Sequence, residues 1–149
     1  MRKRRKREIL IETDVFIAAI DHEDPHHEEA REVITGYSIV LSPYTLIEMD
    51  LLIRSRIIIV KDYCQFWYKV HSLLDQYKIR IIIPSPLHHA EAQEIRARYD
   101  LTYFDSLHAA VAIVNKMKLV SYDEKAYGKI KDLNYAHPHT LIMKDTFEG

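Results

Sequence analysis

The sequence has little cysteine, little glycine and no long apolar run, and each shortage excludes a class of protein. The single cysteine, Cys64, rules out an intramolecular disulfide and any metal site built only from cysteines. No G-x-G-x-x-G segment is present, so a dinucleotide-binding loop is excluded. No apolar run approaches the ~18 residues of a membrane span, because Glu12 and Asp14 interrupt the longest candidate. Cys64 itself lies in an apolar helical stretch, where we expect it to be buried.

The N-terminus is strongly basic but does not resemble a secretory signal. The segment MRKRRKREILI has neither a long apolar core nor a cleavage site of small residues, so we expect the protein to stay in the cytoplasm. Residues 2–7 hold six of the 21 Lys and Arg residues, which leaves 15 basic residues against 22 acidic ones. We therefore expect a basic arm at residues 1–7, either a disordered tail or a contact for nucleic-acid phosphate, and one acidic domain at residues 8–149.

Apolar strands alternate with helices along this domain. Strands are predicted at residues 8–13, 37–42, 78–84 and 118–122. Helices are predicted at residues 24–36 and 62–77, and the second carries an apolar stripe that we expect to lie mostly in the core. Residues 56–60 are predicted to form a connection. Nearly continuous apolar strands that alternate with helices indicate a parallel sheet covered on both faces.

Acidic residues lie where these strands end or in the first turns of predicted helices. They are Glu12, Asp14, Glu48, Asp105 and Asp123. Ligands bind beyond the carboxyl ends of open parallel sheets, and Asp14 closes the first strand while Asp123 follows the last. Because side chains alternate along a strand, we expect Glu12 and Asp14 to project to one side and Thr13 to the other.

Taken singly, each of these acids fits a helix cap. Residues 45–48 and 102–105 match the capping-box pattern, and Asp14 and Asp123 fit the N-cap position. Taken together, at least three of the acids meet at one sheet edge, where like charges repel unless a cation lies among them. Oxygen ligands favour a hard ion such as Mg²⁺ or Mn²⁺, and such ions serve in phosphoryl transfer.

The nine histidines do not indicate zinc, because His22 and His26, which are four residues apart, have Pro25 between them rather than a continuous helix, and the sequence offers no third ligand. His108 follows Asp105 by three residues, and we expect it to pack or to support a ligand rather than to act in catalysis. A phosphate-accepting receiver domain would need an Asp at the end of a middle strand, and the segment RIIIPS has none.

Four segments resemble, in order and spacing, the acidic motifs of PIN-domain ribonucleases, especially the VapC-like toxins of toxin–antitoxin pairs. They are ILIETDVFIAA, LSPYTLIEM, LTYFDSLHAAVA and LVSYDEKAY, and the match runs from residue 8 to about residue 138. The resemblance implies a three-layer α/β/α fold with a central, mostly parallel sheet of four or five strands. It also implies a Mg²⁺- or Mn²⁺-dependent endoribonuclease that forms a homodimer and is inhibited by a small antitoxin.

The resemblance assigns the second, third and fourth acids of the site to Glu48, Asp105 and Asp123, with Ser121 as a supporting hydroxyl two places before the last. Lys125 and the basic arm are candidates for contacting RNA. These positions follow the family pattern closely.

The first motif departs from the family pattern. Members usually open it with Asp, and here Glu12 occupies that place while Asp14 takes the third position. Either Glu12 binds the metal with a longer reach, or Asp14 takes that role with Glu12 and Thr13 in support. A third hypothesis is a weak or inactive enzyme that serves as an RNA- or protein-binding module, because Mg²⁺ tolerates little distortion from octahedral geometry.

Overall fold

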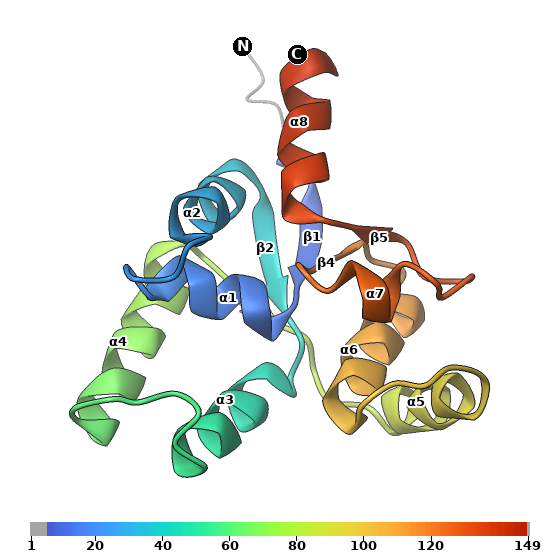
Figure 1. Ribbon diagram of the computed structural model, residues 1–149, viewed down its shortest axis with the longest axis horizontal. Coiled ribbons are helices and arrows are strands. Elements are labelled where there is room, and N and C mark those ends of the chain that lie inside the picture. The colour runs from blue at the N-terminus through green and yellow to red at the C-terminus, as the bar shows by residue number, and fades with distance from the viewer. Residues whose placement is uncertain (1–5, 149) are drawn as a thin grey trace.

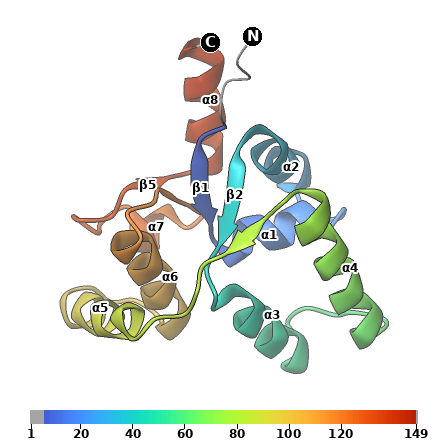
Figure 2. The ribbon, with the colours of Figure 1, turned by 180° about the vertical axis from the view of Figure 1, so that it is seen from behind.

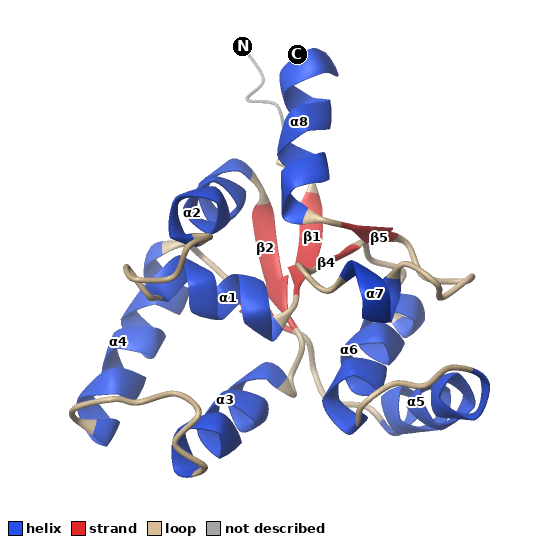
Figure 3. Cartoon of the chain, viewed as in Figure 1, coloured by secondary structure: helices blue, strands red, loops and turns tan. Residues whose placement is uncertain are grey.

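The computed structural model describes residues 6–148 and contains a five-stranded sheet in the order β3-β2-β1-β4-β5. The strands are β1 (Glu8–Ile11), β2 (Ser38–Leu41), β3 (Arg80–Ile81), β4 (Leu119–Val120) and β5 (Tyr135–Ala136). Every neighbouring pair is parallel. Helices lie on both sides of the sheet, so the predicted three-layer α/β/α fold is confirmed (Figure 3).

Eight helices of the described chain connect and cover these strands (Figure 1). They are α1 (Thr13–Ile20), α2 (His27–Gly36), α3 (Thr45–Arg54), α4 (Tyr63–Gln76), α5 (Pro86–Arg98), α6 (Tyr103–Val114), α7 (Glu124–Tyr127) and α8 (Pro138–Glu148). In the part of the chain that is described, no helix is long and apolar enough to cross a membrane.

The core follows the alternation of side chains along β1. Ile9 and Ile11 pack in a buried cluster with residues of α1 and α2, whereas Leu10 packs on the other face with residues of α5 and α6. All three side chains are buried. Fully burying each of them contributes about 1.5–3 kcal/mol, which fixes the register of β1.

All four predicted strands are shorter in the structure than the sequence predicts, the first and third most informatively. The first strand ends at Ile11 rather than at residue 13, because Glu12 is the N-cap of α1 and Thr13 is its first residue. The third predicted strand, residues 78–84, contributes only Arg80 and Ile81, which pair with the end of β2. Residues 56–60 form a connection without helix or strand, as predicted.

Helix α4 is less buried than its apolar stripe predicts. Val70 is its one fully buried residue, Phe66 and Trp67 are half-buried, and Tyr63 is 44% exposed. The prediction that Cys64 is buried is wrong, because this residue lies one position off the stripe and faces solvent. Helix α4 covers an edge of the sheet and therefore shares only part of its apolar surface with the core.

The capping predictions are half right. Thr102 accepts a hydrogen bond from Asp105 N at 3.3 Å, and Asp123 accepts one from Ala126 N at 3.0 Å, so both cap helices. The predictions for Thr45 and Asp14 are wrong, because each lies one or two residues inside its helix. Glu48 and Asp14 are thus not used as caps.

The basic arm falls mostly on residues 1–5, which lie outside the described residues. Its last two residues reach the beginning of the sheet. Lys6 Nζ donates a hydrogen bond to Thr35 O at 2.7 Å, and Arg7 O accepts one from Ser38 N at 2.9 Å. The arm therefore joins the domain where β1 and β2 begin.

Candidate active site

The candidate site lies at the carboxyl edge of the sheet, where β1, β2 and β4 end together (Figure 1). Glu12 follows β1, and Asp123 follows β4 after a short turn. Glu48 lies in the first turn of α3, which follows β2, and Asp105 lies in the first turn of α6. The parallel topology thus brings acids from four separate segments to one edge.

Glu12 is the most deeply buried of these acids, with 6% of its surface exposed. Its Oε2 accepts a hydrogen bond from Ser121 Oγ at 3.2 Å. Burial raises the pKa of Glu12 well above its usual value, and the nearby charges of Asp14, Glu48 and Asp105 raise it further. An ionised carboxylate in this position is unfavourable unless a cation compensates it.

Asp14 is held differently from Glu12. Its Oδ2 accepts hydrogen bonds from Tyr122 N and Ser121 Oγ, both at 2.9 Å, and its Oδ1 accepts one from Val15 N at 2.7 Å. Burial raises the pKa of Asp14, and these hydrogen bonds oppose that rise. Asp14 therefore ties the start of α1 to the segment that follows β4.

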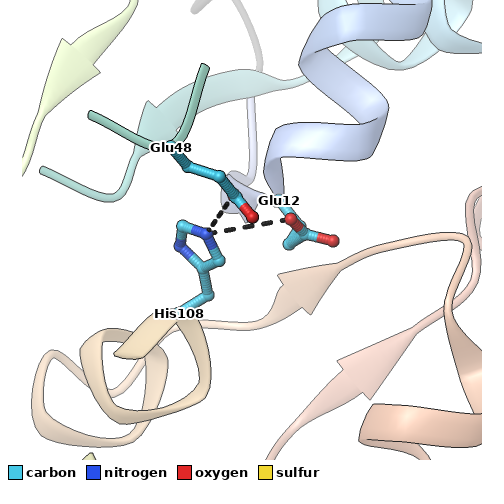
Figure 4. A group of neighbouring side chains, drawn as sticks. All are labelled: Glu12, Glu48 and His108. Carbon is cyan, nitrogen blue, oxygen red and sulfur yellow. Dashed lines mark hydrogen bonds and ion pairs between the residues drawn. The ribbon is translucent and has the colours of Figure 1, made fainter. Parts of the chain in front are cut away.

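The side chains of Glu48 and Glu12 point toward each other, and His108 of α6 faces both of them from one side (Figure 4). His108 Nε2 lies 2.9 Å from Glu48 Oε1 and 3.8 Å from Glu12 Oε1. Burial alone would raise the pKa of Glu48, but the hydrogen bond and charge of His108 outweigh it and lower the pKa. Glu48 is therefore the acid of this group whose ionised form is best supported.

Thr13 lies at the base of the site, and the prediction that it faces away from the acids is wrong. Its Oγ1 lies 3.2 Å from His108 Nε2 and donates a hydrogen bond to Thr45 Oγ1 at 3.2 Å. The alternation of a strand does not apply here, because the chain is already helical at Thr13. Thr13 thus helps to orient the imidazole that contacts Glu48.

Asp105 and Asp123 complete the acidic group. Tyr127, buried on α7, donates its hydroxyl to Asp105 Oδ1 at 3.2 Å. Burial raises the pKa of Asp105 and the charge of Asp123 adds to this rise, while hydrogen bonds from Thr102 and Tyr127 oppose it. Asp123 is exposed at the rim, and its backbone N–H donates to Ser121 Oγ at 3.0 Å.

The donor atoms of the site suit a divalent cation. Glu12, Glu48 and His108 each offer one ligand atom, and these atoms lie within 4.8 Å of one another. Within residues 6–148, this is the one group of three or more such side chains. His108 Nε2 already donates a hydrogen bond to Glu48 Oε1 at 2.9 Å, so the imidazole supports this carboxylate and the oxygens of Glu12 and Glu48 are the ligand atoms left for a hard cation. The neighbouring Asp105 supplies further negative charge.

One residue of the site, Tyr127, was not foreseen, whereas His108 was foreseen in kind but not in its partner. His108 was expected to pack or to support a ligand, and its side chain is fully buried and contacts Glu48. Its position three residues after Asp105 on one helix face is the signal that was available. Tyr127 follows Asp123 by four residues on α7, and nothing in the sequence distinguished it from a core tyrosine. Lys125 is exposed on α7, as its candidate role in RNA contact requires.

A family model described as PIN domain matches residues 9–132. No curated protein matches the chain. The fold is similar to VapBC-1 from nontypeable Haemophilus influenzae, with a TM-score of 0.68 and 16% identity over 89% of this chain and 98% of that one. It is also similar to VapBC2 from Rickettsia felis bound to a promoter DNA fragment, with a TM-score of 0.67 and 20% identity over 87% and 98% of the two chains.

A third similar structure is PAE2754 from Pyrobaculum aerophilum, with a TM-score of 0.56 and 18% identity over 95% of this chain and 97% of that one. At these identities the likeness shows the fold alone. The family model, in contrast, covers most of the chain and spans all of the acids described above. The protein therefore belongs to the PIN-domain family, as its four acidic motifs predicted.

Proposed function

We propose that the protein is a divalent-metal-dependent endoribonuclease that hydrolyses RNA phosphodiester bonds at the carboxyl edge of the sheet. The observation that carries the proposal is the burial of Glu12 beside three other carboxylates. Such a group costs stability unless a cation occupies it, and a fold does not need it for packing. Membership of the PIN-domain family supports the same activity.

Glu12, Glu48 and Asp105 would hold Mg²⁺ or Mn²⁺, and Asp14 would position Glu12. All three hydrogen bonds to Asp14 come from neighbouring protein groups, whereas Glu12 faces Glu48 and His108. Asp14 remains within the acidic group and lends it charge. On this proposal Glu12 is the primary acid of the first motif, and its longer side chain takes the place of the usual Asp.

A bound divalent ion supplies positive charge at the scissile phosphate and lowers the pKa of a coordinated water. The protein's own groups orient the reactants. Asp123 Oδ1 is engaged by Ala126 N, which leaves Oδ2 at the rim to accept a proton from the attacking water or to hold a second ion. His108 fixes Glu48, and Tyr127 fixes Asp105. In-line attack would leave a 5′-phosphate and a 3′-hydroxyl, as the family resemblance implies.

The protein would act as the toxin of a toxin–antitoxin pair, with a small antitoxin and a second copy of the chain as partners. Large apolar side chains are exposed on α3, on the segment that follows it and on α4. They are Ile47, Leu51, Ile57, Ile59, Tyr63 and Tyr68. Exposed apolar surface of this kind is typical of protein interfaces, and similar structures include complexes named VapBC and FitAB. A neighbouring reading frame for a small DNA-binding protein would support this role.

The test is cleavage of a mixed RNA pool by the wild-type protein with Mn²⁺, with Mg²⁺ and with EDTA. We expect cleavage only with the metals. Asp105→Asn should lower the rate by about 10²–10³, because several kcal/mol of charge stabilisation depend on the metal site. Asp132→Asn, which changes an exposed acid outside the group, is the matched control and should cleave normally.

Thermal unfolding separates an enzyme from a binding module. Mn²⁺ at about 100 times its Kd should stabilise the wild type by about 2.7 kcal/mol, since it binds only the folded state. For a chain of this length that is a rise in Tm of roughly 5–10 °C. An inert protein whose Tm ignores Mn²⁺ would overturn the enzymatic proposal, and a protein that binds Mn²⁺ and RNA without cleavage would be a binding module.

A further inference from the structure

The opposite, amino edge of the sheet is as basic as the carboxyl edge is acidic. Basic residues lie just before β1 and β4, and just before and at the first position of β3. They are Lys6, Arg7, Lys78, Arg80, Lys116 and Lys118. Figure 2 shows β1 and β2 beginning at the end of the molecule where the N-terminus lies, away from α3 and from the start of α1.

Two grooves cross this edge on either side of β1. The first has a volume of about 1090 Å³ and is lined by Lys6, Lys78 and polar residues of α2 and α4. The second has a volume of about 460 Å³ and is lined by Arg7, Lys116 and Lys118. Cations therefore outnumber acids in both grooves, by two to one in the first and by three to one in the second.

One acid, Glu8, lines both grooves among the described residues. Arg80 Nη2 lies 2.8 Å from Glu8 Oε1, so Arg80 offsets the negative charge of Glu8. Tyr37 also lines both grooves, and its buried hydroxyl has no hydrogen-bond partner within residues 6–148. The amino edge thus presents unbalanced positive charge beside amide and hydroxyl groups.

Four further cations, Arg2, Lys3, Arg4 and Arg5, immediately precede Lys6 in the sequence and lie outside the described residues. Cations at such density attract a phosphodiester backbone and release its counterions. The acidic carboxyl edge repels the same backbone, so the affinity of the protein for RNA must come from another surface.

We propose that the amino edge is a second RNA-binding surface, which holds phosphates of a single strand at a distance from the bond that is cleaved. The proposal rests on the ribonuclease function proposed above. Lys6 and Glu12 are six residues apart, which corresponds to roughly 20 Å at 3.3 Å per residue. At the rise of about 3.4 Å per nucleotide of a stacked strand, an RNA must extend some six nucleotides beyond the cleaved bond to reach both edges, and an extended strand needs fewer.

The experiment measures binding of a labelled 24-nucleotide RNA by fluorescence anisotropy in EDTA, so that no cleavage occurs. The test variant is Lys78→Asn/Lys116→Asn/Lys118→Gln. Lys78 and Lys116 have φ of 53° and 54°, and Asn tolerates this left-handed conformation better than most residues. The control is Lys61→Gln/Lys69→Gln/Lys131→Gln, which removes the same charge from exposed positions outside the two grooves.

We expect the test variant to raise the Kd about tenfold and to lower the slope of log K against log salt by roughly 2, at about 0.7 per phosphate contact. The control should change the Kd less than twofold. Equal Kd values for test and control variants, or a loss confined to a 24-base-pair DNA duplex, would overturn the proposal. Protection of Lys78 and Lys116 from acetylation by RNA, measured on the wild type, gives the same answer if the test variant does not fold.

Cleavage of a four-nucleotide RNA by the wild-type protein keeps the two proposals separate. This substrate is too short to reach both edges, so its cleavage with Mn²⁺ depends on the acidic site alone. Cleavage of the short RNA together with unchanged binding by the test variant would overturn the second surface and leave the ribonuclease intact. Salt-sensitive binding at the amino edge without any cleavage would overturn the ribonuclease proposal and leave the second RNA-binding surface intact.

Discussion

The two edges of the sheet carry opposite charge and treat it in opposite ways. At the carboxyl edge, Glu12 is buried and its pKa is raised because burial and neighbouring carboxylates disfavour its charge. At the amino edge, Lys78 and Lys116 are exposed, so their ammonium groups are in contact with water. Negative charge at the carboxyl edge is buried in a small volume and destabilises the metal-free fold. Positive charge at the amino edge is solvated and distributed over several strands, so it destabilises the fold little. The first arrangement fits one small cation, and the second fits a long polyanion.

The parallel topology explains why the signs are not reversed. Helices α3 and α6 begin at the carboxyl edge, where helix dipoles favour the acids Glu48 and Asp105. Helices α4 and α6 end at the amino edge just before Lys78 and Lys116, where the dipoles favour cations. The helix dipoles thus favour acidic residues at the carboxyl edge and basic residues at the amino edge. The predictions below test whether these charges also bind metal and RNA.

The largest effect is expected at His108, whose Nε2 lies 2.9 Å from Glu48 Oε1 and 3.8 Å from Glu12 Oε1. His108→Leu removes the donor to Glu48 and should lower both Mn²⁺ affinity and RNA cleavage about 10–100-fold, the usual cost of losing a group that orients a metal ligand. His108→Gln places an amide near the position of Nε2 and should recover most of the loss. Isothermal titration with Mn²⁺ and cleavage rates measure the two effects.

A purely structural His108 would behave otherwise. Both variants would then lower the Tm in metal-free buffer and leave the Mn²⁺ affinity per folded molecule unchanged. That result would show that His108 does not orient a metal ligand and that the acids of the carboxyl edge have a structural role only.

The next effect concerns the stability of the metal-free protein. The folded-state pKa of Glu12 lies above its ordinary value near 4.5, so the folded state holds this proton more tightly than the unfolded chain. The stability linked to it is present below about pH 4.5 and is lost as the pH rises through the raised pKa. The pKa of Asp105 is shifted in the same direction, and that of Glu48 in the opposite one.

Glu12→Gln removes the main part of this penalty. In EDTA at pH 8, the variant should be more stable than the wild type by about 1–2 kcal/mol, and its stability should fall less with rising pH. Addition of Mn²⁺ should reverse the order, since the variant lacks a ligand. A variant that is less stable than the wild type in EDTA would show that Glu12 stabilises the fold without a metal.

Much of the fold was predictable because it depends on apolar runs that are long enough to read. The strands at β1 and β2 and the helix at α4 follow directly from such runs, and their alternation predicts a parallel sheet. The two-residue strands β3 and β5 depend on pairing with longer neighbours, and no local pattern marks their limits. The prediction that Cys64 is buried failed because burial depends on which face of α4 meets the sheet, and this is a tertiary feature.

The acids of the site were predictable from topology, but their individual surroundings were not. Parallel strands bring their carboxyl ends together wherever they lie in the sequence, and this placed Glu48 and Asp105 correctly at one edge. The direction of Thr13 depended on the single residue at which β1 becomes α1. The contact of His108 with Glu48 joins residues of α6 and α3 that are 60 positions apart in the sequence, so no local pattern predicts it.

The smallest effect on stability, and a sharp test of the comparison, concerns the ion pair of Arg80 and Glu8. Both side chains are about half exposed, and such pairs contribute roughly 0–1 kcal/mol, so Arg80→Gln and Glu8→Gln should each leave the free energy of unfolding within that range. Their effects on RNA binding should be opposite. Glu8→Gln removes the one acid that lines both grooves and should tighten binding at low salt, whereas Arg80→Gln leaves that acid uncompensated and should weaken it. Anisotropy at 50 and 200 mM salt measures both, and equal shifts in the two variants would mean that RNA does not sense the charge of the amino edge.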